Sequence, residues 1–101
     1  MVLFCLINYG ECLYLTERSR GLAGVQAVIR VIDQSALVVV PAERSLVFEA
    51  AHIKARYPIS YADAFAAALA KRHGARLMTG DAEFKAVEHE VAIHWLPTRR
   101  R

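Results

Sequence analysis

The chain has 101 residues, enough for one domain and too few for two. Apolar residues make up 55% of it, which argues for a packed core and against a disordered chain. The formal net charge of +3 is a weak indication of an acidic partner such as nucleic acid. No apolar run reaches the roughly 18 residues of a membrane span, and the first residues lack the features of a signal peptide. We therefore expect a cytoplasmic protein with no membrane contact.

Apolar periodicity predicts an all-helical start followed by a strand. The spacing that begins at Phe4 predicts a helix over about residues 3–18, and a second apolar stripe predicts a helix over about residues 22–32. The run Ala36–Val40 is continuous, rich in β-branched residues and stopped by Pro41. It predicts a strand buried on both faces. Because no strand precedes the first helix, we expect the sheet to lack its opening member.

The rest of the chain alternates helices with strands. A helix is expected over residues 42–56, ending before Pro58, and Ser60 caps a further helix that ends at Gly74. The remaining elements are a strand over 75–79, a short helical segment over 80–87 and a strand over 91–95 that places Trp95 in the core. This alternation predicts an α/β fold with a largely parallel sheet.

The cysteines, the histidines and the basic tail suggest no site of their own. Cys5 and Cys12 are too far apart for a CxxC pair, so we expect two buried free thiols. The four histidines show no paired spacing typical of zinc ligands. The terminal run Arg99–Arg101 is expected to be a solvated tail, with a phosphate-contacting arm as the alternative.

Three acidic residues lie in apolar surroundings. Glu11 falls on the apolar stripe of the first helix, where an unpaired carboxylate would cost several kcal/mol, so it requires a partner or an exposed edge. Asp63 has a simple explanation as the acid of a capping box with Ser60. Asp81, between a strand and a short helix, has one as an N-cap.

The path of the chain gives these acids a second interpretation. The helix after Asp63 advances about 15 Å, and the strand that returns to Asp81 covers about the same distance. If that strand runs antiparallel to the helix, the two carboxylates meet at the carboxyl end of a strand, where open α/β sheets place their sites. Adjacent carboxylates repel unless a cation lies between them, and oxygen ligands suit Mg²⁺ or Mn²⁺. Such a cation activates water for attack on a phosphodiester.

The same residues stand in motifs that resemble the PIN domains of VapC-type toxins, from Ile7 to the end of the chain. Four segments carry the resemblance: Ile7–Glu11 with Tyr14 resembles the asparagine–glutamate helix, Ile59–Ala70 the aspartate helix, Thr79–Phe84 the "TGD-x-EF" turn, and Val91–Leu96 the closing strand. The segments occur in the family's order and at similar spacing.

The resemblance implies a fold and an activity. The fold is a three-layer α/β/α sandwich with a mostly parallel sheet, and the activity is hydrolysis of RNA at an acidic cluster that holds Mg²⁺ or Mn²⁺. By position, Glu11, Asp63 and Asp81 are expected as catalytic, metal-binding acids, with Asn8, Thr79 and Glu83 in support. The implied partners are an RNA substrate, a VapB-type antitoxin and a second copy of the chain in a homodimer.

The chain departs from the family pattern at its start. Family members begin with a strand that ends in an aspartate, followed by a helix, and no acid precedes Glu11 here. Asp33, the only spare acid nearby, falls at the end of the second helix and has no counterpart in the family. We therefore expect a single, N-terminally truncated PIN domain over residues 1–101, produced by a late start or a shortened gene. The loss of one ligand and one strand is expected to impair catalysis and to favour low solubility or dimerisation.

Two alternatives remain open. The first is a catalytically inactive PIN-like binding module that retains antitoxin or dimer contacts, and antitoxin binding that is independent of metal would favour it. The second is an unrelated small α/β protein whose acids only cap helices, which requires Glu11 to lie far from Asp63 and Asp81. The nuclease interpretation predicts that Mn²⁺ stabilises the chain and that Asp63→Asn abolishes this effect.

Overall fold

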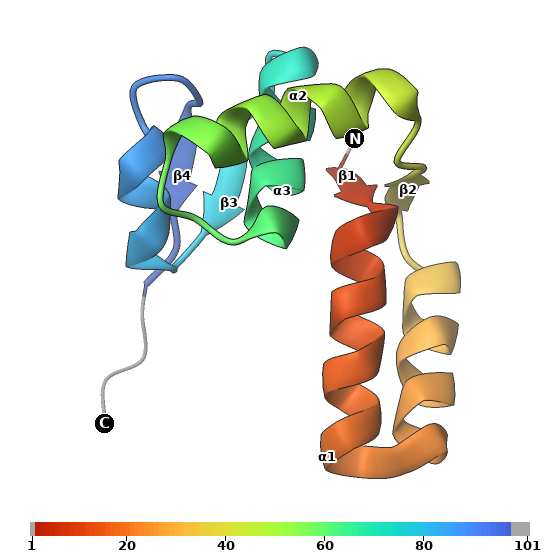
Figure 1. Cartoon of the computed structure of the whole chain (residues 1–101). Coiled ribbons are helices and arrows are strands. Elements are labelled where there is room, and N and C mark those ends of the chain that lie inside the picture. The colour runs from red at the N-terminus through yellow and green to blue at the C-terminus, as the bar shows by residue number, and fades with distance from the viewer. Residues whose placement is uncertain (1, 98–101) are drawn as a thin grey trace. The chain divides into compact units, whose positions relative to one another are not determined.

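The structure is a computed structural model that describes residues 2–97, so the arginine tail lies outside the described residues. The chain divides into two compact units, Met1–Ala42 and Glu43–Arg101. The elements in chain order are β1 (Val2–Cys5), α1 (Leu6–Asp33), β2 (Leu37–Val40), α2 (Arg44–Arg56), α3 (Tyr61–Arg72), β3 (Leu77–Thr79), the 3₁₀ helix η1 (Ala82–Val87) and β4 (Ile93–Trp95) (Figure 1).

The first unit is a β-α-β arrangement. β1 pairs with β2 in parallel, with Val2 opposite Leu37 and Cys5 opposite Val40, and α1 connects the two strands. The expectation that no strand precedes the first helix is therefore wrong. A short apolar run such as the one that begins at Val2 fits a buried helix turn and a strand equally well, and here pairing with β2 decides in favour of the strand.

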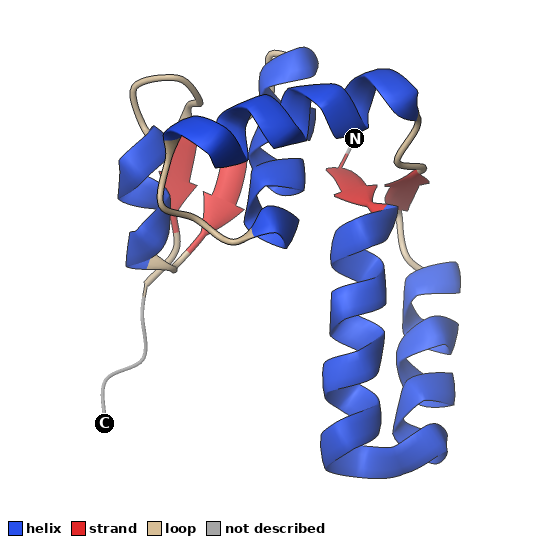
Figure 2. Cartoon of the chain, viewed as in Figure 1, coloured by secondary structure: helices blue, strands red, loops and turns tan. Residues whose placement is uncertain are grey.

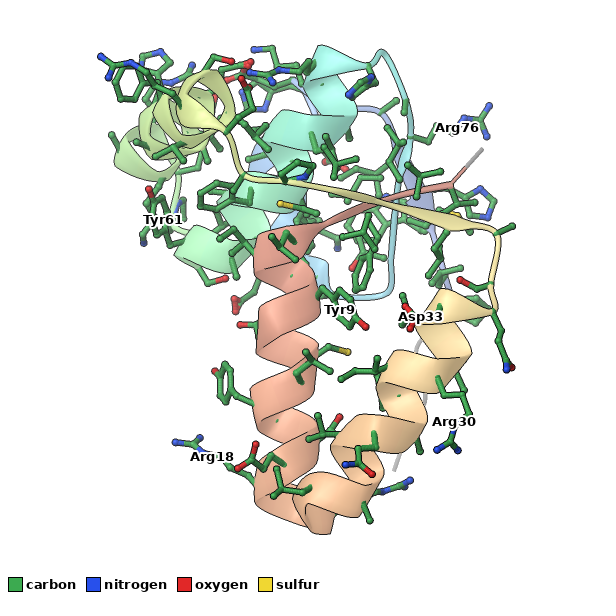
Figure 3. All side chains as sticks on the ribbon, turned by 90° about the vertical axis from the view of Figure 1, so that its right-hand side faces the viewer. Tyr9, Arg18, Arg30, Asp33, Tyr61 and Arg76 are labelled. Carbon is green, nitrogen blue, oxygen red and sulfur yellow. The ribbon has the colours of Figure 1, made fainter. Side chains whose placement is uncertain are left out.

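The two helices expected at the start form two arms of α1, which bends at Gly21. Its dihedral angles (φ 70°, ψ −171°) are open almost only to glycine. A Cβ atom on Gly24 would lie 2.6 Å from the Cβ of Arg20, so this turn also needs a second small residue. Figure 3 shows Arg18 and Arg30 pointing away from the two arms. The turn thus depends on two glycines rather than on polar residues alone.

The second unit is built on α2 and α3, which contact each other along their buried faces. On α2 the buried residues Leu46, Ala50 and Ile53 follow helical spacing. The side chain of Glu43 caps α2 by accepting from the N–H of Leu46, and β3 pairs in parallel with β4. Figure 2 shows this second strand pair beside α3. The core of the unit consists of Leu46, Ala50, Ile53, Ile59, Ala64, Phe65, Ala67, Ala68, Leu69, Ala70, Phe84, Val87 and Val91.

The α/β class and the parallel strand pairing are confirmed, with one two-stranded sheet in each unit. Three burial expectations are wrong, because Val38 of β2 is 41% exposed, Trp95 is 39% exposed and Cys12 is exposed. Cys5 is a buried free thiol, as predicted. Among residues 2–97, no helix is long and apolar enough to cross a membrane.

Candidate metal centre

The first acid of the site, Asp63, lies in the first turn of α3. Ser60 is the N-cap of this helix, and its hydroxyl accepts a hydrogen bond of 3.1 Å from the backbone N–H of Asp63. The preceding helix, α2, ends at Arg56 because Pro58 disfavours helix in the residue before it, and α3 begins here because Ser60 satisfies an otherwise unpaired N–H group. The N-cap role expected for Ser60 is therefore confirmed. It holds the Asp63 backbone in place, and the carboxylate of Asp63 is half-buried and hydrogen-bonded to Ser60.

The second acid, Asp81, lies at the end of β3 and caps η1. Its backbone N–H donates to the Thr79 hydroxyl (3.0 Å), and its Oδ1 accepts from the backbone N–H of Glu83 (2.9 Å). The Thr79 side chain thus orients the backbone of Asp81, and its supporting role in a metal site stays a prediction. The cap on Glu83 brings this third carboxylate to the same turn.

The carboxylates of Asp63, Asp81 and Glu83 converge in the second unit. Each offers one oxygen, and these oxygens all lie within 4.8 Å of one another. The pKa of Asp63 is raised, chiefly because partial burial disfavours its charged form and further because Asp81 is negatively charged, while a hydrogen bond with Ser60 opposes the shift. The return of Asp81 to Asp63, predicted from the lengths of the helix and the strand, is confirmed.

This donor set fits a divalent cation. Three carboxylates gathered around one point repel each other, and a cation at that point removes the repulsion. The donors are hard oxygen atoms, the kind that Mg²⁺ and Mn²⁺ prefer, and the group contains no histidine or cysteine. Two of the acids are exposed, so water and a substrate phosphate can reach the same ion. The arrangement is suited to hydrolysis of a phosphodiester.

The other two predicted site residues, Asn8 and Glu11, lie on the first arm of α1 in the Met1–Ala42 unit. Both are half-buried, and their spacing of three residues puts them on one face of the helix. Their membership of the metal site stays a prediction.

Two residues, Glu83 and Ser60, take a larger part in the site than the sequence predicted. Glu83 was expected at the margin of the site, but it belongs to the same carboxylate group as Asp63 and Asp81. The signal was available, because an N-cap aspartate followed two residues later by a glutamate holds both acids in one turn. Ser60 was expected only as a cap, although it also interacts with the carboxylate of Asp63.

This geometry defines a class of protein: an α/β protein with a carboxylate cluster at the end of a parallel strand. Comparison with protein families matches residues 1–90 to the PIN domain, and the chain belongs to this family. PIN domains are generally nucleases that depend on a divalent metal ion. Comparisons with curated proteins and with solved structures gave no match.

Proposed function

We propose that this protein is a metal-dependent ribonuclease of the VapC type, which hydrolyses RNA phosphodiesters at the carboxylate cluster of Asp63, Asp81 and Glu83. The observation that carries the proposal is the convergence of three carboxylate oxygens within 4.8 Å in a chain of the PIN family. We assign Asp63 and Asp81 as catalytic, metal-binding residues, with Glu11 as a further acid of the site. Mg²⁺ or Mn²⁺ is the ion.

Each residue of the site has a physical task. A bound cation supplies charge stabilisation for the phosphodiester and lowers the pKa of a water molecule. Asp63 and Asp81 bind the ion, and Thr79 keeps the backbone of Asp81 in the orientation that presents its carboxylate. Glu83 lies close enough to the same point to bind the ion directly or to accept a hydrogen bond from its water. Asn8 is assigned to hydrogen bonding beside Glu11.

The cellular role in this proposal is that of a toxin in a type II toxin–antitoxin system. A VapB-type antitoxin neutralises it, it acts on RNA in the cytoplasm, and it forms a homodimer. We further propose that residues 1–101 act as a single PIN domain. The truncation expected from the sequence, with reduced activity as its consequence, also stays a prediction.

The test is cleavage of a 5′-labelled RNA by the purified chain in Mn²⁺, in Mg²⁺ and in EDTA. We expect cleavage with either metal and none in EDTA. Asp63→Asn should lower the rate by at least about 100-fold, because the loss of a residue that merely supports a ligand already costs about 10- to 100-fold. Glu88→Gln, which removes an exposed acid outside the cluster, is the matched control and should cut at the wild-type rate.

Two results would count against the proposal. Cleavage that survives Asp63→Asn would show that the RNA is cut elsewhere or by a contaminant. An inactive chain whose melting temperature does not respond to Mn²⁺ would favour the inactive binding module, and antitoxin binding that is unaffected by EDTA would add to that interpretation.

A further inference from the structure

One exposed face of α2 carries basic and aromatic side chains in a row. Arg44, Phe48, His52 and Arg56 follow each other at intervals of four residues, which keeps them on one side of the helix. All four are exposed. Over this row the helix advances about 18 Å at about 1.5 Å per residue. The face is therefore long enough to contact an extended chain rather than a single small molecule.

Phe48 is the unusual member of this row, since it is 59% exposed. The guanidinium carbon of Arg44 lies 4.8 Å from the centre of its ring, which is a cation–π arrangement. The pair offers an aromatic ring and a planar cation to the same side of the helix. Both surfaces stack on nucleic-acid bases, and the cation also attracts phosphate.

The row leads into a groove of about 290 Å³ between α2 and α3, which His52, Arg56, Lys71 and Arg72 line among others. Arg56 and Lys71 both pair with Glu90, at 2.8 and 2.5 Å, so one carboxylate holds two cations. This pairing orders both cationic groups before any ligand arrives and gives the trio one net positive charge. Arg72 with its two partners, Glu43 and Glu49, carries one net negative charge on the other side of the groove lining.

Arg56 and Lys71 remain accessible to a phosphate while they are paired. Their side chains are 38% and 51% exposed, whereas their shared partner Glu90 is 14% exposed. Arg72, beside Lys71 on α3, is held by Glu43 and Glu49 and is 28% exposed. A phosphodiester at the edge of the groove can therefore contact cations that are already ordered, while Glu90 keeps its own contacts with them.

We propose that this face of α2, with the groove beside it, binds a single-stranded segment of the RNA substrate, stacking a base on Phe48 and placing backbone phosphates near Arg44, Arg56 and Lys71. The inference rests on the proposed function, because it assigns a second contact to the same RNA. A single strand fits better than a duplex, since only unpaired bases expose a ring face to an aromatic side chain. An acidic protein segment would use the cations but would gain little from Phe48.

The test measures binding of a labelled single-stranded RNA by fluorescence anisotropy in EDTA, where no metal occupies the carboxylate cluster. We expect Phe48→Ala to weaken binding about tenfold, the range that loss of one base stack gives, and Phe48→Trp to restore it. Tyr14→Ala is the matched control, because Tyr14 is a half-exposed ring on α1 with the guanidinium carbon of Arg18 5.3 Å from its centre. It should change the affinity less than twofold.

A second arm measures the salt dependence. Arg44→Gln should reduce the slope of log affinity against log salt by about 0.7, the value for one phosphate contact on a single strand. Lys54→Gln, which removes an exposed charge from another side of α2, should leave the slope unchanged.

Several outcomes would overturn the inference: no binding in EDTA, an equal loss with Tyr14→Ala, duplex RNA bound as tightly as single strands, or polyglutamate competing as well as RNA. If the wild type cleaves RNA with Mn²⁺ and Phe48→Ala leaves KM unchanged, this face is wrong and the nuclease proposal stands. If the wild type does not cleave while its RNA binding depends on Phe48, the nuclease proposal fails and the face is supported.

Discussion

The two units of the chain differ in how their side chains are buried. Among the described residues, every buried apolar side chain except Cys5 belongs to the Glu43–Arg101 unit, and α1 contributes none. In the Met1–Ala42 unit, Leu22 and Val31 are 67% and 65% exposed. This difference in burial indicates which acids of the candidate site are held by a packed core. The carboxylates of the second unit project from elements with their own core, whereas Glu11 projects from a helix without one.

The largest effect that separates the two units is expected from matched leucine truncations. Leu46 is fully buried in the second unit, so Leu46→Ala should lower the free energy of unfolding by about 2–5 kcal/mol. Leu22, exposed in the first unit, should lose less than about 0.5 kcal/mol when replaced by alanine. Urea unfolding followed by circular dichroism measures both. Equal losses would mean that the first unit buries Leu22 in solution.

An intermediate effect is expected from two glycines of α1. Gly21→Ala should destabilise the chain by about 1–3 kcal/mol, because the dihedral angles of Gly21 are accessible almost only to glycine. Gly10→Ala should stabilise it by up to about 1 kcal/mol, because a Cβ there meets nothing within 4 Å and alanine is the better helix former. Thermal unfolding of the two variants checks the opposite signs. A stabilising Gly21→Ala would contradict the bend at this residue.

The smallest effect is expected from Glu90 and depends on pH. Hydrogen bonds from Lys71, and then from Tyr57 and Arg56, lower the pKa of Glu90 from 4.5 to about 2. The ionised form is thus preferred in the folded chain, and its contribution is complete above the ordinary pKa and is lost as the pH falls towards 2. Glu90→Gln should therefore cost about 1 kcal/mol near neutral pH, since the partner cations are exposed, and almost nothing near pH 2.

Urea midpoints of the wild type and Glu90→Gln across this pH range measure the difference. Glu88→Gln, two residues away and exposed, serves as the control and should show no comparable change. A difference that grows as the pH falls would reverse the assigned sign.

Much of the second unit could be predicted from the sequence. Residues with local signals, such as the cap at Ser60 and the terminator at Gly74, mark where α3 begins and ends. The approach of Asp63 to Asp81 followed from element lengths and from the assumption that the strand runs antiparallel to the helix, because the rise per residue of a helix and of a strand is nearly constant. These features depend on neighbours in the sequence, so periodicity captures them.

The features that were missed depend on contacts between distant segments. Val2–Cys5 became a strand because β2 pairs with it, and no local pattern encodes that pairing. Cys12 was expected in the core because of its residue type and Trp95 because of its place on the last strand, although burial is decided by what covers a side chain. The exposure of Phe48 escaped notice for the same reason. The positions of Asp63 and Asp81 were therefore predicted more accurately than the exposure of the apolar side chains.

Binding of a divalent cation by the carboxylate cluster can be tested by direct titration of Mn²⁺. The electron paramagnetic resonance signal of free Mn²⁺ falls when the ion binds, so it reports affinity without any RNA. We predict that the wild type binds Mn²⁺ and that Asp63→Asn and Asp81→Asn each weaken binding at least about tenfold, while Glu88→Gln does not. Glu11→Gln tests in the same assay whether the first unit contributes a ligand. Mn²⁺ binding that is unchanged by Asp63→Asn and Asp81→Asn would mean that the cluster is not the metal site and that both residues act only at helix N-termini.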